Sequence, residues 1–169
     1  QQPSARMWLR GKVTATRPVH DEVKAADVLV ITRPNGFSGC DFAAIHRINP
    51  ALIYAELSAF GDDSALPVSE PVVAARMGRM KSMEGIVKAP GPRYAAVQVA
   101  THAASQNLVT GILAALHERS KSGSGQMVKT SLGDALTPYD QGASLTMQVR
   151  PPSVTPTTPI DPSTFMPTL

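Results

Sequence analysis

The sequence has little charge, few aromatic residues and a single cysteine. Of its 169 residues, 17% are charged and 5% are aromatic. Because Cys40 is the single cysteine of the sequence, an internal disulfide is excluded. One cysteine also suits a reducing compartment, so we expect a cytoplasmic protein. The basic residues are scattered, without a run of like charge or interleaved aromatic residues, and we therefore expect no nucleic-acid partner. No apolar run approaches the length of a membrane span, so we expect neither a membrane partner nor a signal peptide.

Several motifs of enzyme chemistry are also missing from the sequence. No group of histidine, cysteine, aspartate and glutamate residues has the spacing of metal ligands, so we expect no metal cofactor. Neither a G-x-S-x-G nucleophile motif nor a phosphate-binding P-loop occurs. The formal net charge of +3 is mildly basic, which suits a phosphate-bearing ligand without requiring one.

Proline and threonine dominate the C-terminal stretch. From Arg150 onward these residues are closely spaced and show no apolar periodicity, which is typical of an extended segment. Hydrophobic residues make up 43% of the chain, enough for one domain with a real core. We therefore divide the sequence into a core domain over 1–149 and an extended Pro/Thr-rich arm or linker over 150–169.

The first half of the chain predicts a strand, a helix and a second strand. Asp27–Thr32 is continuously apolar at its centre, as in a parallel strand covered on both faces. Asp41–Ile48 has helical spacing, and Leu52–Ser58 predicts the second strand. Short joins make this a right-handed unit with parallel strands. Open parallel sheets bind ligands beyond the carboxyl ends of their strands, so the loops 32–36 and 58–63 are the expected ligand site.

The second half is organised around a long helix from Thr101 to about Lys121. Large apolar residues recur at three- and four-residue steps and predict one buried stripe: Leu108, Val109, Ile112, Leu113 and Leu116. Gly123 is expected to end the helix, and alternating residues predict a strand over 126–132. A further helix is expected to begin at Asp134, which would cap it. The predicted fold class is α/β, with a parallel Rossmann-like sheet flanked by helices.

The segment between these two halves is less regular. Residues 72–83 predict a helix with Met77, Met80 and Met83 along one side, which is typical of core or interface packing. A strand is expected over 94–99, where apolar residues alternate. One interpretation of these features is a structural or dimerisation subunit that binds a partner chain through the methionines and the proline-rich arm.

Two blocks of sequence carry a resemblance to a known family. One block is GILAALHERSKSGSGQMVKTSLGDAL, and the other joins ADVLVITRPNGF to INPALIYAELSAFG. Both resemble the class III CoA-transferases, a family that also includes racemases of 2-methylacyl-CoA thioesters. The resemblance extends roughly over residues 12–137. It implies coenzyme A or an acyl-CoA as substrate, and transfer of CoA between an acyl-CoA and a carboxylic acid.

The resemblance also implies positions for the ligand contacts. The residues implied at the CoA are Arg10, Lys12, Thr32 and Arg33. Phe60 and Gly61 fall in the loop that borders the acyl pocket in the family. For the three basic residues, solvated surface charges are an equally open interpretation.

Members of the resembling family are about twice as long as this sequence and form interlocked dimers. The resemblance therefore implies a sequence that is incomplete relative to the family, as a fragment, a shortened relative or ordered pieces with gaps. It also implies a partner, either a second copy in a homodimer or a second CoA-transferase domain.

The nucleophile of the family is missing from its expected place. In the family, an aspartate at the start of the long helix attacks the acyl-CoA thioester and forms a mixed anhydride. Counting back ten residues from Gly111 leads to Thr101, and no acidic residue occurs between Glu84 and Glu118. We therefore expect a CoA-binding domain whose catalysis is impaired.

Other routes to activity stay open. Glu70 stands where the family often has an acidic residue that organises the acyl site, so an active transferase could use Glu70, or an acid from a partner chain. His102 could activate Thr101 in principle, although adjacent residues of a helix point in different directions. The racemase branch also needs a histidine, and Ser69 stands near its expected position, so racemisation has less support.

Overall fold

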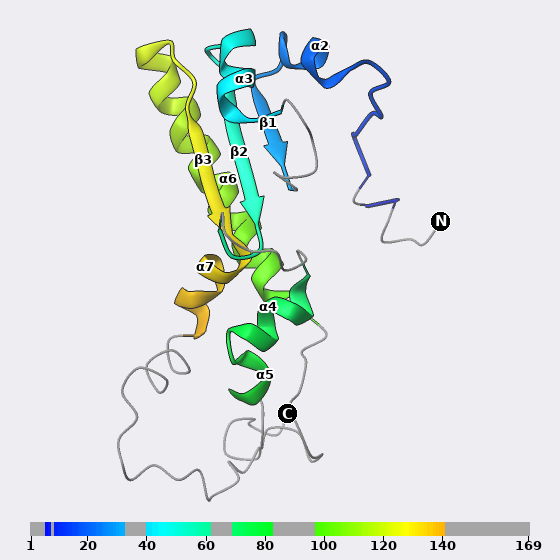
Figure 1. The fold of residues 1–169 in the computed structure, drawn as a ribbon, viewed down its shortest axis with the longest axis vertical. Coiled ribbons are helices and arrows are strands. Elements are labelled where there is room, and N and C mark those ends of the chain that lie inside the picture. The colour runs from blue at the N-terminus through cyan, green and yellow to red at the C-terminus, as the bar shows by residue number, and fades with distance from the viewer. Residues whose placement is uncertain (1–5, 8, 33–39, 62–68, 83–96, 141–169) are drawn as a thin grey trace, which may run out of the picture.

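The computed structural model describes residues 6–7, 9–32, 40–61, 69–82 and 97–140. They form a three-stranded parallel sheet with helices packed on it, which confirms the predicted α/β class (Figure 1). The predicted arm over 150–169 and the domain boundary before it lie outside these residues. Within the described ranges, none of the helices combines the length and the apolar character of a membrane-spanning segment.

The sheet has the order β1-β2-β3, with every neighbouring pair parallel. Its strands are β1 (Val28–Ile31), β2 (Ile53–Ser58) and β3 (Met127–Ser131). The helix α3 (Phe42–Ile48) carries the chain from β1 back to β2, as the sequence predicted. Asp41 begins this helix, because its Oδ1 accepts a hydrogen bond of 2.9 Å from the Ala44 backbone N–H.

The two faces of the sheet carry different side chains because neighbours along a strand alternate. On one face, Tyr54 joins a buried cluster with α2 (Val19–Val23), α3 and the chain around them. The buried members of that cluster are Val23, Ile31, Cys40, Ile45, Leu52 and Tyr54. The phenol O–H of Tyr54 donates to the Cys40 carbonyl oxygen at 2.9 Å, and burial raises the pKa of this tyrosine.

On the other face, the helix α6 (Val99–Ser122) packs against β2 and β3. The strand β1 lies at the sheet edge, and the side chain of Val30 is 49% exposed. The prediction that both faces of this strand are covered is therefore wrong for the described residues, because α6 crosses the other two strands instead.

The buried face of α6 is lined mainly by small residues. Its buried residues are Ala100, Ala103, Ala104, Leu108 and Ala115. A Cβ atom on Gly111 would lie 2.6 Å from Cγ1 of Val128, so only a glycine allows this close approach of helix and strand. The predicted stripe of large residues is correct at Leu108 but wrong at Val109 and Leu113, which are 53% and 61% exposed.

The carboxyl-terminal end of α6 is fastened to the amino ends of the strands. Gly123 ends the helix with φ +74°, as predicted, and its N–H donates to the Arg119 carbonyl oxygen at 2.8 Å. The guanidinium of Arg119 pairs with Oδ1 of Asp27 at 2.8 Å and donates to the Ala51 carbonyl oxygen at 3.1 Å. Gly125 has no room for a side chain, because a Cβ atom there would overlap the Leu52 carbonyl.

Two shorter predictions need correction. The expected helix over 72–83 is instead two helices, α4 (Glu70–Arg76) and α5 (Arg79–Ser82), because Gly78 between them adopts φ +74°. Met77 packs against the core, whereas Met83 lies outside the described residues. The expected strand over 94–99 is wrong at its end, since α6 already begins at Val99; its first part, 94–96, is not described.

The helix after β3 begins earlier than predicted. Helix α7 (Leu132–Leu136) is capped by Ser131, whose Oγ accepts a hydrogen bond of 3.0 Å from the backbone N–H of Asp134. The hydroxyl of Ser131 also donates to the carboxylate of Asp134 at 2.6 Å. Asp134 is therefore the acidic residue of the first turn rather than the cap. A 3₁₀ turn, η2 (Thr137–Asp140), follows directly.

Candidate functional site

All three strands end at the same edge of the sheet, because they run parallel. Thr32 follows β1 and is exposed, and Ala59, Phe60 and Gly61 follow β2. The structure thus brings Thr32 and the Phe60–Gly61 loop to one edge, at the place where open parallel sheets bind ligands. Arg33 lies outside the described residues.

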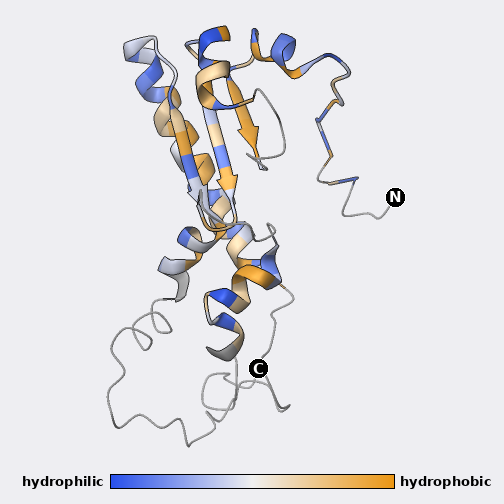
Figure 2. Cartoon of the chain, viewed as in Figure 1, coloured by the Kyte–Doolittle hydropathy of each residue, from blue (hydrophilic) through white to orange (hydrophobic). Residues whose placement is uncertain are grey.

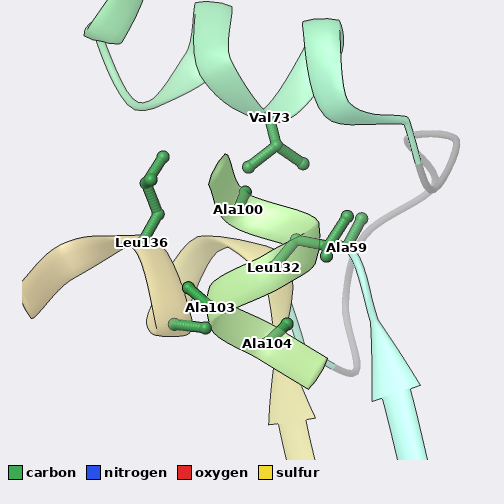
Figure 3. Close-up of a cluster of buried hydrophobic side chains, with 8 residues drawn as sticks. Ala59, Val73, Ala100, Ala103, Ala104, Leu132 and Leu136 are labelled. Carbon is green, nitrogen blue, oxygen red and sulfur yellow. The ribbon is translucent and has the colours of Figure 1, made fainter. Parts of the chain in front are cut away.

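Beneath this edge, four elements meet in one apolar cluster (Figure 3). The end of β2, the helices α4 and α7 and the start of α6 contribute its buried residues, which are Ala59, Val73, Ala100, Ala103, Ala104, Leu132, Ala135 and Leu136. Figure 2 shows α4 at this edge, with polar residues at its two ends, Glu70 and Arg76, and apolar residues between them. The cluster places the first residue of α4 against the first turn of α6.

Glu70 is the centre of that contact. Its side chain is buried, with 7% exposed, and its carboxylate accepts three hydrogen bonds from α6. Oε1 accepts from the Ala100 backbone N–H at 2.8 Å, while Oε2 accepts from the Thr101 backbone N–H at 2.8 Å and from its hydroxyl at 2.7 Å. Glu70 and Thr101, predicted separately, therefore form one hydrogen-bonded pair.

This arrangement satisfies the open end of a long helix. The first N–H groups of an α-helix have no partner within the helix, and the residue before α6, Gln98, supplies no side-chain cap. The described first turn of α6 also contains no acidic residue. Glu70 provides both missing parts, since it accepts from two backbone N–H groups and brings negative charge to the positive end of the helix dipole. A carboxylate so paired can be buried at modest cost.

His102 does not take part in this pair. Its backbone N–H donates to the Gln98 carbonyl oxygen at 3.0 Å, as expected within a helix, and its side chain is exposed. In the described part of the chain, the hydroxyl of Thr101 has Glu70 as its recorded partner. The sequence left His102 open as the group that activates Thr101, but the hydroxyl of Thr101 donates its hydrogen bond to Glu70.

The loop after β2 has a fixed shape. Gly61 adopts φ +85°, and its N–H donates to Oγ of Ser58 at 2.9 Å. The Ala59 carbonyl oxygen accepts from the Gly133 N–H at 3.0 Å. A Cβ atom on Gly133 would lie 3.0 Å from Cδ1 of Phe60, so the ring occupies the space that this glycine leaves open.

One charged residue that lies beside this loop was not predicted from the sequence. The guanidinium carbon of Arg76, the last residue of α4, lies 5.1 Å from the centre of the Phe60 ring. Such stacking of a cation on an aromatic ring is favourable. The signal in the sequence was weak, because Arg76 was one of several basic residues on a predicted helix and nothing local connected it to Phe60.

The two other basic residues of the predicted CoA site are not part of this group. Arg10 and Lys12 lie in an exposed segment before α2, and the hydrogen bonds recorded there join backbone atoms of neighbouring residues. Their assignment to a CoA phosphate therefore stays a prediction. Within the described ranges, no three histidine, cysteine or acidic residues lie close enough together to hold a metal ion.

Comparison with known proteins agrees with this arrangement. The sequence profile of CoA-transferase family III matches residues 15–162. Formyl-CoA:oxalate CoA-transferase of Streptomyces avermitilis is 31% identical over 131 residues, which cover 75% of this chain and 31% of that enzyme. Acetyl-CoA:oxalate CoA-transferase of Acetobacter aceti is 29% identical over 149 residues, which cover 79% of this chain and 38% of that enzyme.

A solved structure shows the same arrangement of elements. The orthorhombic crystal form of Rv3272 from Mycobacterium tuberculosis superposes with a TM-score of 0.68 at 25% identity, covering 78% of this chain and 38% of that one. The chain thus spans about a third of the length of the curated relatives that it matches. Enzymes of this kind act on CoA thioesters, and the profile match extends over most of the sequence. The chain belongs to CoA-transferase family III.

Proposed function

We propose that this chain carries the CoA-thioester site of a family III transferase in a form without the nucleophilic carboxylate. One observation supports it above the others: Thr101, at the start of α6, donates its hydroxyl hydrogen to Oε2 of Glu70 at 2.7 Å. The hydroxyl stands at the place where the family resemblance puts an aspartate. The carboxylate nearest to it acts as the cap of the helix.

The chemistry of a hydroxyl differs from that of a carboxylate at this step. A carboxylate that attacks an acyl-CoA gives a mixed anhydride, which CoA thiolate readily opens again. A threonine hydroxyl gives an ester, which is much less activated and does not pass CoA to an acceptor acid. We therefore propose that the site binds coenzyme A or an acyl-CoA without forming the covalent intermediate. The names of the relatives include oxalate, so we propose a small dicarboxylate as the class of acid that this site binds without receiving CoA.

Glu70 as nucleophile is the first alternative. Glu70 is the first residue of α4 and lies against the start of α6, but both of its oxygens already accept hydrogen bonds from α6. Attack on a thioester would require Glu70 to release these donors and leave them unpaired in a buried place, which is costly. An acid from a partner chain is the remaining route to an active enzyme.

A structural role is the second candidate function. The outward side of α6 exposes Val109 and Leu113, which lie one turn apart and form an apolar surface. Such a surface suits a homodimer or a second CoA-transferase domain in the cytoplasm. Light scattering tests this candidate, because a chain that is monomeric at all accessible concentrations excludes the homodimer.

The proposed function is tested by trapping an acyl-enzyme. The chain is incubated with acetyl-CoA and hydroxylamine and then digested for mass spectrometry, with Glu70→Gln as a parallel sample. We expect no adduct on Thr101 or Glu70. A hydroxamate on Glu70 that is lost in Glu70→Gln would establish the first alternative and overturn the proposal of impaired catalysis.

A further inference from the structure

Arg76 presents an unused set of hydrogen-bond donors at the loop after β2. Its side chain is exposed, and in the part of the chain that the structure describes its N–H groups have no hydrogen-bond or ion-pair partner. The recorded contact is the stacking on Phe60, with 5.1 Å between the guanidinium carbon and the ring centre. A guanidinium carries five N–H donors, and its attraction to the ring does not require any of them to form a conventional hydrogen bond.

The ring beneath this guanidinium is held in place. Phe60 packs against the apolar cluster, and the absence of a side chain on Gly133 provides the room for it. The Ala59 carbonyl oxygen, which accepts from the Gly133 N–H at 3.0 Å, fixes the backbone next to the ring. A guanidinium stacked on a fixed ring loses less conformational freedom when it binds a ligand than a free surface arginine does.

The charge of Arg76 is not neutralised by the acidic residue of the same helix. Glu70, at the other end of α4, directs its carboxylate to the N–H groups of Ala100 and Thr101. Among the described residues, the edge of the sheet near Phe60 therefore keeps an available positive charge. The paired N–H donors of a guanidinium match the planar, two-oxygen geometry of a carboxylate and also bind phosphate.

We propose that Arg76, supported by the Phe60 ring, binds an oxyanion of the substrate at the carboxyl edge of the sheet. The oxyanion is a carboxylate of the acid substrate or a phosphate of CoA. This inference rests on the proposed function and adds to it a residue that determines which anionic group is recognised. Arg76 is a binding residue in this account and takes no part in bond making.

The test is calorimetric titration of the whole chain, once with oxalate alone and once with CoA alone. The variants are Arg76→Gln, which removes the charge, and Arg76→Lys, which keeps the charge without the planar fork. Arg47→Gln is the matched control, because Arg47 is an exposed arginine in the last turn of the seven-residue helix α3, at the opposite edge of the sheet. Circular dichroism and thermal unfolding establish that each variant keeps the fold.

The expected result is saturable binding of at least one ligand by the unmodified chain. Arg76→Gln should weaken that ligand about tenfold or more, Arg76→Lys should weaken it less, and Arg47→Gln should leave it unchanged. If Arg76→Gln loses affinity for oxalate but not for CoA, the group that Arg76 binds is a carboxylate. If it loses affinity for CoA but not for oxalate, that group is a phosphate.

Other results would overturn the inference in distinguishable ways. If the unmodified chain binds neither ligand, the proposed function fails and this inference fails with it. If the unmodified chain binds and Arg76→Gln binds equally well, only the role of Arg76 is wrong. Equal losses in Arg76→Gln and Arg47→Gln would show a general charge effect and would also exclude a specific site.

Discussion

At the scale of single residues, the proposed function depends on the contact between Glu70 and Thr101. Two backbone N–H groups and one hydroxyl of α6 are satisfied by a carboxylate that lies about thirty residues earlier in the chain. Buried donors without partners are costly, so the cap stabilises both the helix and the packing of α4 on it. The same contact keeps the hydroxyl and the carboxylate occupied with each other.

Replacing Glu70 should therefore be strongly destabilising. We expect Glu70→Ala to lower the free energy of unfolding by about 3 kcal/mol, because it leaves three donors unpaired. Thr101→Val removes one donor and should cost about 1 kcal/mol. Urea denaturation measures the free energy of unfolding of both variants. Glu22→Ala is the control, since Glu22 forms an exposed ion pair with Arg17 at 2.8 Å and its loss should cost less than about 1 kcal/mol. Equal effects of Glu70→Ala and Glu22→Ala would contradict the capping role.

The raised pKa of Tyr54 predicts that the stability of the fold decreases at alkaline pH. Burial is the main reason that its pKa is raised above 10.0, and the negative charge of Glu56 adds to this. A raised folded-state pKa means that the stabilisation is fully present below pH 10.0 and is lost as the pH rises through the folded-state value.

The tyrosine prediction is tested by absorbance of the phenolate during an alkaline titration. The chain contains three tyrosines, and Tyr54 should ionise later than an ordinary tyrosine. Tyr54→Phe should remove this late part of the titration and reduce the loss of stability at high pH. A titration curve whose late part is unchanged in Tyr54→Phe would show that the buried phenol is not its source.

At the scale of elements, α6 shows where sequence patterns succeed and where they fail. Its length and its end at Gly123 could be predicted, because helical periodicity and a glycine in the left-handed conformation are local properties. The buried face of α6 could not be predicted in the same way. The pattern selects large apolar residues such as Leu113, whereas close packing against the neighbouring elements requires alanine residues and Gly111.

Gly111 and Val128 should accordingly be coupled. Gly111→Ala places a Cβ atom against Val128 and should cost about 1–2 kcal/mol despite the better helix propensity of alanine. In the Gly111→Ala background, Val128→Ala should cost less than it does alone or should even stabilise. Urea denaturation of the four proteins of this double-mutant cycle measures the coupling. Strictly additive effects would contradict the close approach of α6 to β3.

Among the site residues, those that follow a strand directly were the predictable ones. Thr32, Phe60 and Gly61 lie at the carboxyl edge because each comes directly after a parallel strand, which a sequence pattern reveals. Arg76 and the hydrogen bonds of Glu70 depend on how α4 packs against the rest, and no local pattern carries that information.

At the scale of the whole molecule, the account combines a family scaffold with an altered centre. The sheet is parallel, and one apolar cluster at its carboxyl edge joins the end of β2, the start of α6 and the helices α4 and α7 (Figure 3). The guanidinium of Arg76 lies over the ring of Phe60, which packs against this cluster. The chain belongs to CoA-transferase family III, and we propose that this edge is its site for CoA thioesters. The hydrogen-bonded pair of Thr101 and Glu70 is the point where we propose that the chemistry departs from that of the family.

Equilibrium dialysis against acetyl-CoA, followed by assay of the thioester on the protein side, tests this central claim most directly. The account predicts that acetyl-CoA accumulates with the chain and is recovered with its thioester intact. Failure of acetyl-CoA to accumulate even at concentrations on the order of millimolar, or recovery of free CoA with the acetyl group on the protein, would contradict it.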